Sequence, residues 1–353
     1  MKRRSILPHA KAGLGGCIAL LSASLASAAP GSDFQLFLRS AIANRQQSID
    51  FSSRYLHDFR REIGGFQNVV GLDYYTKFSG AERDWATAVL QIYGARLDGH
   101  PNPPGFFEGS DDWELWPRIL NFNFHLIPDR SLSVRVGHFE MPYGLEVPIN
   151  SNGTIRQLNH VPNLGTKVDW GITLNGTLEH FQYEVGLSRG SGVELNMGND
   201  SYIFAGRIGT VSDRETFYGV NSLGISFFQS SIQTPLGTFT RRRRIGFDAQ
   251  HYWGPYGAMA EISPGTDNNR FVLNSLLEVN ATNRRENTLF YLQYRHSNAD
   301  RPTGWVQSSA VGLGVRWAPD NHWALSGQTD RALRTSGGGP PSTLFQLQVR
   351  YRF

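Results

Sequence analysis

Several absences narrow what this 353-residue chain can be. Its single cysteine, Cys17, lies in a basic and apolar N-terminal segment, so the rest of the chain has no thiol for a disulfide or a metal site. Beyond that segment the sequence has no run of about 18 apolar residues, which excludes a membrane-spanning helix. The histidines lack metal-site spacing, and no G-x-S-x-G motif is present. We therefore expect no enzyme, and no catalytic, cofactor-binding or metal residues.

The N-terminal segment has the order of a secretory signal peptide. Four basic residues precede an apolar run over residues 13–25 and the small residues Ala26-Ser27-Ala28. This order predicts a signal peptide over residues 1–28 and cleavage before Ala29. Lipid attachment at Cys17 is disfavoured, because the apolar stretch follows that cysteine instead of preceding it. Residues 29–353 are then a single exported domain.

Lysine and net charge are both scarce in that domain. The formal net charge of +4 equals the four basic residues of the signal peptide, which contains no acid. The remaining domain is therefore formally neutral, and Lys77 and Lys167 are its two lysines. A neutral domain gives no argument for nucleic acid as a partner.

The last twelve residues alternate between two kinds of side chain. Apolar and aromatic residues follow every second position up to Phe353, while Gln346, Gln348, Arg350 and Arg352 occupy the positions between them. A period of two predicts a β-strand. Arginines cannot face a dry core without partners. A strand with lipid on one face and water on the other satisfies both faces, as in transmembrane barrels.

The same alternation recurs along the chain and predicts about sixteen strands that can cross a bilayer at a tilt. Short turns alternate with longer connections, as expected for the periplasmic turns and external loops of an outer-membrane barrel. The predicted longer connections are 45–65, 98–112, 144–167, 192–200, 299–305 and 334–341. A soluble sandwich or propeller is the alternative, but its strands would be nearer about five or six residues long. We therefore predict an all-β fold, a closed antiparallel transmembrane barrel. The predicted strands are 34–44, 66–78, 85–97, 113–127, 131–143, 168–178, 181–191, 201–209, 221–234, 240–253, 255–263, 270–282, 287–298, 306–318, 322–333 and 342–353.

A barrel of this size predicts a water-filled interior, because about 16–18 strands leave an aqueous channel. Charged residues on the polar face of the strands should line it. Bases outnumber acids in this set, so we expect the channel to favour anions. The alternative is that these charges only solvate the wall and pair across strands. The predicted pore-lining and selectivity residues are Arg135, Arg207, Arg242, Arg244, Arg295, Arg316, Arg350 and Arg352, with Asp73, Lys77, Glu184, Asp248, Glu261 and Glu278 on the same face.

Four consecutive arginines, residues 241–244, have the appearance of a nucleic-acid patch. They begin a strand whose next outward residues are Ile245 and Phe247. That parity directs Arg242 and Arg244 into the pore and leaves Arg241 and Arg243 at the outer interface.

The segment from Arg135 to Glu146 resembles the G-x-F-x-x-P-[FY]-G-L-E run of the phosphate-selective porin O and P family. The resemblance implies a 16-stranded channel, commonly trimeric, whose third loop folds into the lumen and narrows it. Residues 144–167 form the third predicted external loop. Its candidate constriction residues are Glu146, Arg156, His160 and Lys167. Members that select phosphate use lysine with arginine along the anion path, so the scarcity of lysine here argues for a general or differently selective porin.

We therefore expect an outer-membrane porin for passive diffusion of small hydrophilic solutes, favouring anions and working without a cofactor. Its expected partners are outer-membrane lipid, the solute and two further copies of the chain. The alternative is an outer-membrane barrel with a plugged lumen that acts as an adhesin or a structural protein.

Overall fold

The computed structural model describes residues 39–353, except 81–82, 100–111, 150, 152, 196–199, 212–214, 217–218, 234–236 and 337–338. The predicted signal peptide, residues 1–28, therefore lies outside the described residues, as does its Cys17. Within the described part of the chain, no helix is long and apolar enough to cross a membrane.

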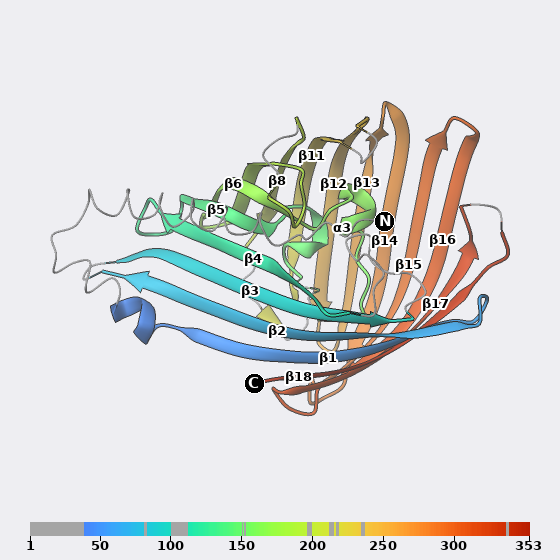
Figure 1. Ribbon diagram of the computed structural model, residues 1–353, viewed down its shortest axis with the longest axis horizontal. Helices are drawn as coiled ribbons and strands as arrows, with labels where there is room; N and C mark the ends of the chain where they lie inside the picture. The colour runs from blue at the N-terminus through green and yellow to red at the C-terminus, as the bar shows by residue number, and fades with distance from the viewer. Residues whose placement is uncertain are drawn as a thin grey trace.

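Sixteen strands close into one antiparallel barrel, which confirms the predicted fold class. Each strand pairs with its neighbours in the sequence, and β18 closes the ring by pairing with β1 (Figure 1). The barrel strands are β1 (Gln46–Asp58), β2 (Ile63–Ser79), β3 (Asp84–Asp98), β4 (Glu114–His125), β5 (Ser133–Glu140), β6 (Val168–Thr177), β7 (Phe181–Ser188), β8 (Tyr202–Thr210), β11 (Ser222–Gln233), β12 (Phe239–Trp253), β13 (Tyr256–Asp267), β14 (Arg270–Thr282), β15 (Thr288–Arg301), β16 (Gly304–Trp317), β17 (Trp323–Arg334) and β18 (Thr343–Arg352).

Four short elements complete the described structure. A two-stranded hairpin of β9 (Glu215–Thr216) and β10 (Gly219–Val220) lies in the connection between β8 and β11. The 3-10 helix η1 (Gly144–Glu146) and helix α3 (His160–Leu164) belong to the connection between β5 and β6. Residues 39–43 are also helical.

The predicted strand at 34–44 and the predicted loop at 45–65 were wrong. Residues 39–43 are helical, residues 34–38 lie outside the described part, and the first strand is β1 within the predicted loop. Ala41 of the helical turn packs against Phe78 and Ala86. A short apolar pattern does not distinguish a strand from a helix, and the outward face of β1 includes the polar residues Ser53 and His57.

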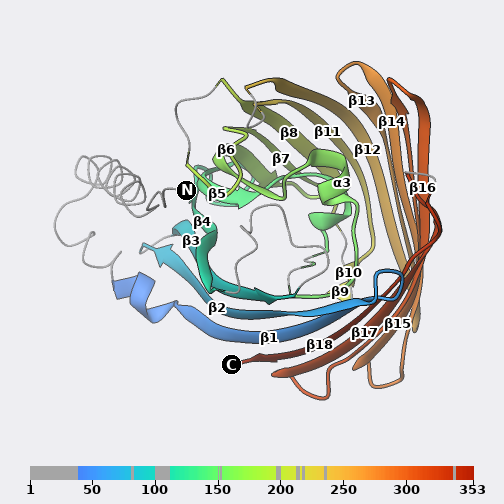
Figure 2. The ribbon, with the colours of Figure 1, turned by 45° about the vertical axis from the view of Figure 1, so that its right-hand side comes forward.

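The predicted long connection at 299–305 was also wrong, because β15 and β16 continue to Arg301 and from Gly304. The polar sequence of residues 297–301 resembles a loop, yet its backbone continues the ladder with β16. Longer connections do occur at the end of the barrel opposite Phe353, namely 99–113, 141–167, 189–201 and 335–342. The third of the connections at that end, residues 141–167, folds inside the ring of strands, where Figure 2 shows α3.

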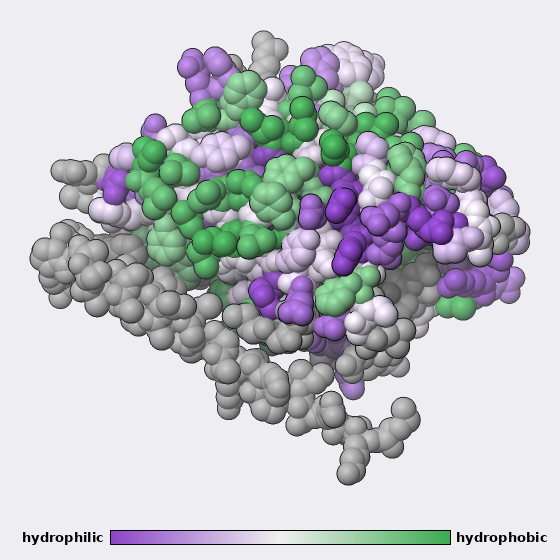
Figure 3. Space-filling model, turned by 90° about the horizontal axis from the view of Figure 1, so that it is seen from above, coloured by the Kyte–Doolittle hydropathy of each residue, from purple (hydrophilic) through white to green (hydrophobic). Residues whose placement is uncertain are grey.

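The two faces of the wall differ in polarity as the alternation predicts. Along β12, Ile245 and Phe247 are exposed on the outer face, while Arg244 and Asp248 are buried on the inner face. Cross-strand register keeps this parity from strand to strand, since Asp248 is level with Glu261 and Phe247 with Ile262. Figure 3 shows hydrophobic side chains gathered over the left and centre of one face and hydrophilic ones on the right.

The inner wall contains a fully buried ion pair between β8 and β12. Arg207 Nη2 lies 2.6 Å from Asp248 Oδ1, and its Nε donates to Oδ2 at 3.0 Å. Gly224 and Gly209 leave the space that this guanidinium occupies, because a Cβ at either position would overlap it. The side chains of Arg207 and Asp248 are 2% and 0% exposed, so each charge depends on the other.

Replacing Arg207 with methionine should lower the free energy of unfolding by about 3–5 kcal/mol, because Asp248 would remain buried without its cation. Denaturant unfolding of the refolded protein, followed by tryptophan fluorescence, measures this loss. Adding Asp248→Leu should recover most of it. Equal stability of the single and double variants would contradict the assignment.

Candidate pore lining and third loop

Apolar side chains on the inner wall hold the third connection, residues 141–167, inside the barrel. Inward residues of β5, β8, β11, β13 and β14 supply the wall side of two apolar clusters, and the loop supplies the rest. Burial of such side chains stabilises the docked loop by about 25 cal/mol for each Å² removed from water. The first cluster contains Phe139, Met141, Tyr143, Leu164, Ile203, Ala205 and Phe228, and the second contains Leu145, Ile149, Met259 and Leu276.

Glu261 of β13 fixes the start and the end of the loop at one point. Its carboxylate accepts hydrogen bonds from the backbone N–H of Leu145 at 2.8 Å and from Asn163 Nδ2 at 2.7 Å. Ser263, on the same inner face, accepts from Tyr143 Oη and from Asn163, both at 3.0 Å. Two distant parts of the loop are therefore bound to neighbouring wall residues.

Arg156, a predicted constriction residue, forms an ion pair with Glu278 of β14. Its Nε donates to Glu278 Oε2 at 2.8 Å, and its Nη2 donates to Oε1. The two side chains are 8% and 0% exposed. Gln293 of β15 donates both to Glu278 at 2.8 Å and to the carbonyl of Gln157 at 2.9 Å. This arginine therefore anchors the loop to the wall.

The tip of the loop reaches the seam where the first and last strands meet. Arg54 of β1 donates to the carbonyl of Thr154 at 3.0 Å, and Arg350 of β18 donates to that of Gly153 at 3.4 Å. Gly153 has a φ of 69°, in the left-handed region that favours glycine. A Cβ there would also overlap the guanidinium of Arg350.

The other three predicted constriction residues lie close together within the loop; they are Glu146, Lys167 and His160. Lys167 Nζ is 2.5 Å from Glu146 Oε1 and donates to Ser151 Oγ at 2.8 Å. Burial is the largest influence and opposes ionisation of Glu146, but the charges of Lys167 and His160 and the hydrogen bonds from Lys167 and Ser151 together outweigh it and lower the pKa of Glu146. His160 is 3% exposed, and burial lowers its pKa. All four predicted residues thus serve contacts within the loop or with the wall.

Carboxylates face seven of the eight predicted pore-lining arginines at ion-pair distance. Arg207 and Arg244 are buried, so neither guanidinium can meet a passing solute. Arg316 is half-buried on the same face. The pairs are Arg135–Glu184, Arg207–Asp248, Arg242–Asp267, Arg244–Asp267, Arg295–Asp330, Arg350–Asp50 and Arg352–Asp73.

Several partners in this network were missed from the sequence. Asp50 and Arg54 lie in β1, which was predicted to be a loop. Arg118 contacts Glu140 at 2.5 Å from a bulge in the pairing of β3 with β4. The bulge shifts the side-chain parity of β4, which alternation alone does not reveal. Asp267 and Asp330 follow the inner parity. Asp267 could have been found by extending the predicted strand 255–263, and Asp330 already lay within the predicted strand 322–333.

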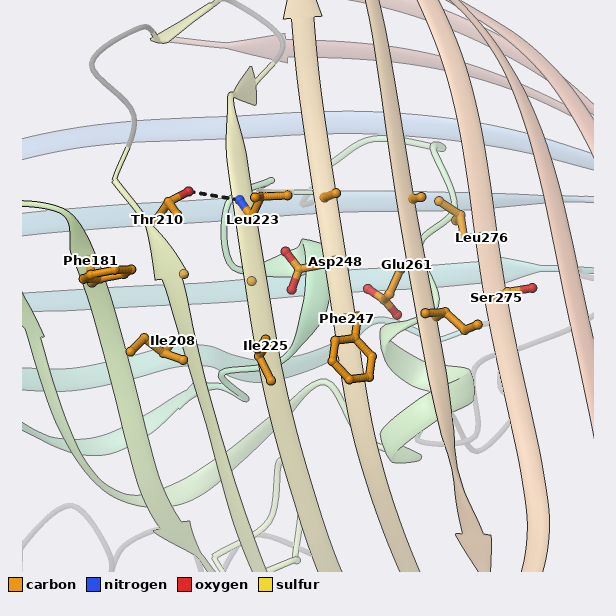
Figure 4. Close-up of a pocket in the computed structure, with 15 residues that line it drawn as sticks. Phe181, Ile208, Thr210, Leu223, Ile225, Phe247, Asp248, Glu261, Ser275 and Leu276 are labelled. Atoms are coloured by element: carbon orange, nitrogen blue, oxygen red, sulfur yellow. Dashed lines mark hydrogen bonds between the residues drawn. The ribbon is translucent and has the colours of Figure 1, made fainter.

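An apolar pocket of about 640 Å³ lies on the outer face of the barrel, not in its interior. Figure 4 shows its lining, which includes Ile208, Ile225 and Phe247. These three side chains are exposed, whereas Asp248 and Glu261 of the same strands are buried on the inner face. The pocket therefore opens toward the surroundings of the barrel.

No protein-family model and no curated protein sequence matches this chain. Solved structures do match it. OprB of Pseudomonas putida is similar with a TM-score of 0.65 and 12% identity over 92% of this chain and 96% of that one. The anion-selective porin from Comamonas acidovorans has a TM-score of 0.60 and 13% identity over 88% and 99%. The chain has the fold of outer-membrane porins.

A third match is OmpT, an outer membrane protein of Vibrio cholerae, in its trimer form. It has a TM-score of 0.60 and 10% identity, covering 88% of this chain and 99% of that one. At such identities the likeness establishes the architecture of the barrel alone.

Replacing Arg156 with glutamine should loosen the third loop, because Glu278 would lose the cation that compensates its buried charge. Hydrogen–deuterium exchange of residues 153–165 should increase by at least about tenfold. Arg270→Gln provides the control, since Arg270 lies on the same strand as Glu278 and forms an exposed pair with Asp300 of β15. Equal exchange in the two variants would refute the anchoring role of Arg156.

Docking of the loop should weaken as the pH falls below 6.5, the ordinary pKa of histidine. Because the pKa of His160 is lowered in the docked loop, the undocked loop binds a proton more tightly and gains stability in acid. The pKa of Glu146 is lowered from 4.5, so its contribution persists to a lower pH. The protection factors of residues 153–165, which correct for the slower intrinsic exchange at lower pH, should therefore fall between pH 6.5 and 4.5. His160→Leu should abolish this fall; an unchanged profile would contradict the role of His160.

Proposed function

We propose that this protein is an outer-membrane porin through which small hydrophilic solutes diffuse passively. The observation that carries the proposal is the polarity of the closed barrel, which presents Ile245 and Phe247 outward and Arg244 and Asp248 inward. Backbone groups in an apolar layer must be paired internally, and closure of sixteen strands achieves this. A barrel of this size encloses water unless its interior is filled. Export through the periplasm with removal of residues 1–28 belongs to the same proposal.

We further propose that the channel prefers anions only modestly. The sequence predicts an excess of arginine, but carboxylates compensate most lumen arginines in the described residues. Arg54 differs, because no carboxylate of the described part of the chain lies within ion-pair distance of it. Arg352 is paired with Asp73 but its side chain is 45% exposed. These two guanidinium groups are the best candidates to attract an anion.

Phosphate specificity is not part of this proposal. The resemblance of residues 135–146 to the phosphate-selective porin family supports a related channel. However, of the two lysines, Lys167 is engaged with Glu146 and Lys77 with Asp84. Neither lysine therefore provides a compact ammonium group that is free to bind phosphate. The similar structures, which include an anion-selective porin, support the broader class.

We also propose that the protein forms a homotrimer in the outer membrane. The trimer form of the similar OmpT supports this assembly. Sedimentation velocity of the purified protein in density-matched detergent would distinguish a trimer from a monomer.

The packing of residues 141–167 inside the barrel favours a second candidate, a barrel with a closed lumen that serves as an adhesin or structural protein. Two buried apolar clusters occupy part of the interior, as a plug would. Planar-bilayer recordings separate the candidates. Ohmic single-channel steps support the porin, and their absence from well-inserted protein supports the closed barrel.

Two substitutions at the strand seam should change ion selectivity in opposite directions. Arg54→Gln removes an uncompensated cation and should shift the reversal potential in a KCl gradient toward cation preference. Asp50→Asn releases the guanidinium of Arg350 and should shift it toward anion preference. The Arg284→Gln variant, altered in an exposed turn, serves as the control. Shifts of equal sign, or no shift in either variant, would reject this assignment of selectivity.

A further inference from the structure

Two arginines of β12 point away from the barrel interior. Arg241 and Arg243 are exposed, whereas Arg242 and Arg244, which alternate with them, face the lumen and approach Asp267. The backbone around Arg241 is fixed, because its N–H donates to Asn268 Oδ1 and its carbonyl accepts from the N–H of Asn268, both at 2.8 Å. The outward direction of these two side chains therefore follows from the register of the sheet.

No carboxylate in the described part of the chain lies within ion-pair distance of Arg241 or Arg243. Their cross-strand neighbours on β11 are Ser231 and Gln229, which are uncharged. On β13, Arg243 is level with Thr266, also uncharged. The nearby Asp267 is on the inner face and interacts with Arg244 at 2.6 Å. The outer face here has two positive charges that no carboxylate of the described residues balances.

These charges lie where the apolar band of the outer face ends. The next outward residues along β12 are Ile245 and Phe247, which are 54% and 47% exposed. On the other side, toward the barrel end that lies away from Phe353, Arg241 is adjacent to the two-residue turn 268–269 between β13 and β14. Tyr202 and Gln229, joined by a 3.1 Å hydrogen bond, lie beside them. An aromatic residue with polar groups at the end of an apolar band is typical of a membrane interface.

We propose that Arg241 and Arg243 bind the phosphate groups of a phosphorylated glycolipid in the external leaflet of the outer membrane. A guanidinium group presents a planar set of donors that matches phosphate, and it is more weakly hydrated than an ammonium group. Residues two apart on a strand are separated by about 6.8 Å, so the two side chains can engage one phosphate together or two neighbouring phosphates. The apolar residues below them would then contact the acyl chains of the same lipid.

The proposal requires the barrel to lie in an outer membrane with Arg241 at the external rim, but it does not depend on ion selectivity. The test is a titration of the purified full-length mature protein with bisphosphorylated lipid A in detergent, read by native mass spectrometry. The variant carries Arg241→Gln and Arg243→Gln. The matched control carries Arg284→Gln and Arg285→Gln, which remove the same charge from an exposed turn at the opposite rim.

The dissociation constant of lipid A should rise at least about fivefold in the test variant and stay within about twofold in the control, and it should rise with salt in the wild type. Lipid A stripped of both phosphates should bind the wild type no more tightly than intact lipid A binds the test variant. A smaller rise, an equal rise in the control, or displacement of lipid A by equimolar inorganic phosphate would overturn the proposal. Single-channel conductance of the test variant should be unchanged, which separates this outcome from failure of the channel assignment.

Discussion

A backbone that crosses an apolar layer has no water with which to form hydrogen bonds, and the rest of this structure depends on that constraint. The chain satisfies it by pairing each strand with its neighbours and finally β18 with β1. Closure removes the open edges that would otherwise pair with other chains. It also fixes the parity of every side chain, because register is transmitted from one strand to the next. The distribution of charge between lumen and surroundings follows from this parity.

The enclosed space creates a second requirement, which is that charges facing it must be compensated. Ion pairs between arginines and carboxylates meet this requirement. A large lumen must contain water, packed side chains or both, and here the third loop brings apolar groups into it. Charges near these groups lose solvent and become costly unless compensated. Arg207 and Asp248 represent the fully buried case, whereas Arg352 and Asp73 remain partly in contact with solvent. The same residue type therefore stabilises the wall at one position and remains in contact with solvent at another.

The sequence was sufficient to predict the barrel because period-two alternation is a local property that repeats in every strand. It failed at β1, whose outward face includes Ser53 and His57, and at residues 297–301, whose polar composition resembles a loop. The lumen side of Arg207 and Asp248 could be predicted from parity, but their pairing could not, since it joins β8 to β12 across the intervening β11. The position of Arg156 against Glu278 depends on the path of the whole loop. Such long-range contacts leave no local pattern in a single sequence.

The attachment of the loop tip to both Arg54 and Arg350 has a consequence for the order of assembly. These residues belong to the first and last barrel strands, which are separated by almost the entire chain and become neighbours only when the cylinder is complete. A growing sheet that lacks its final strand cannot offer both donors to residues 153 and 154. The third loop therefore reaches its final position as the last event of ring formation, so docking of the loop tip and sealing of the wall are one step.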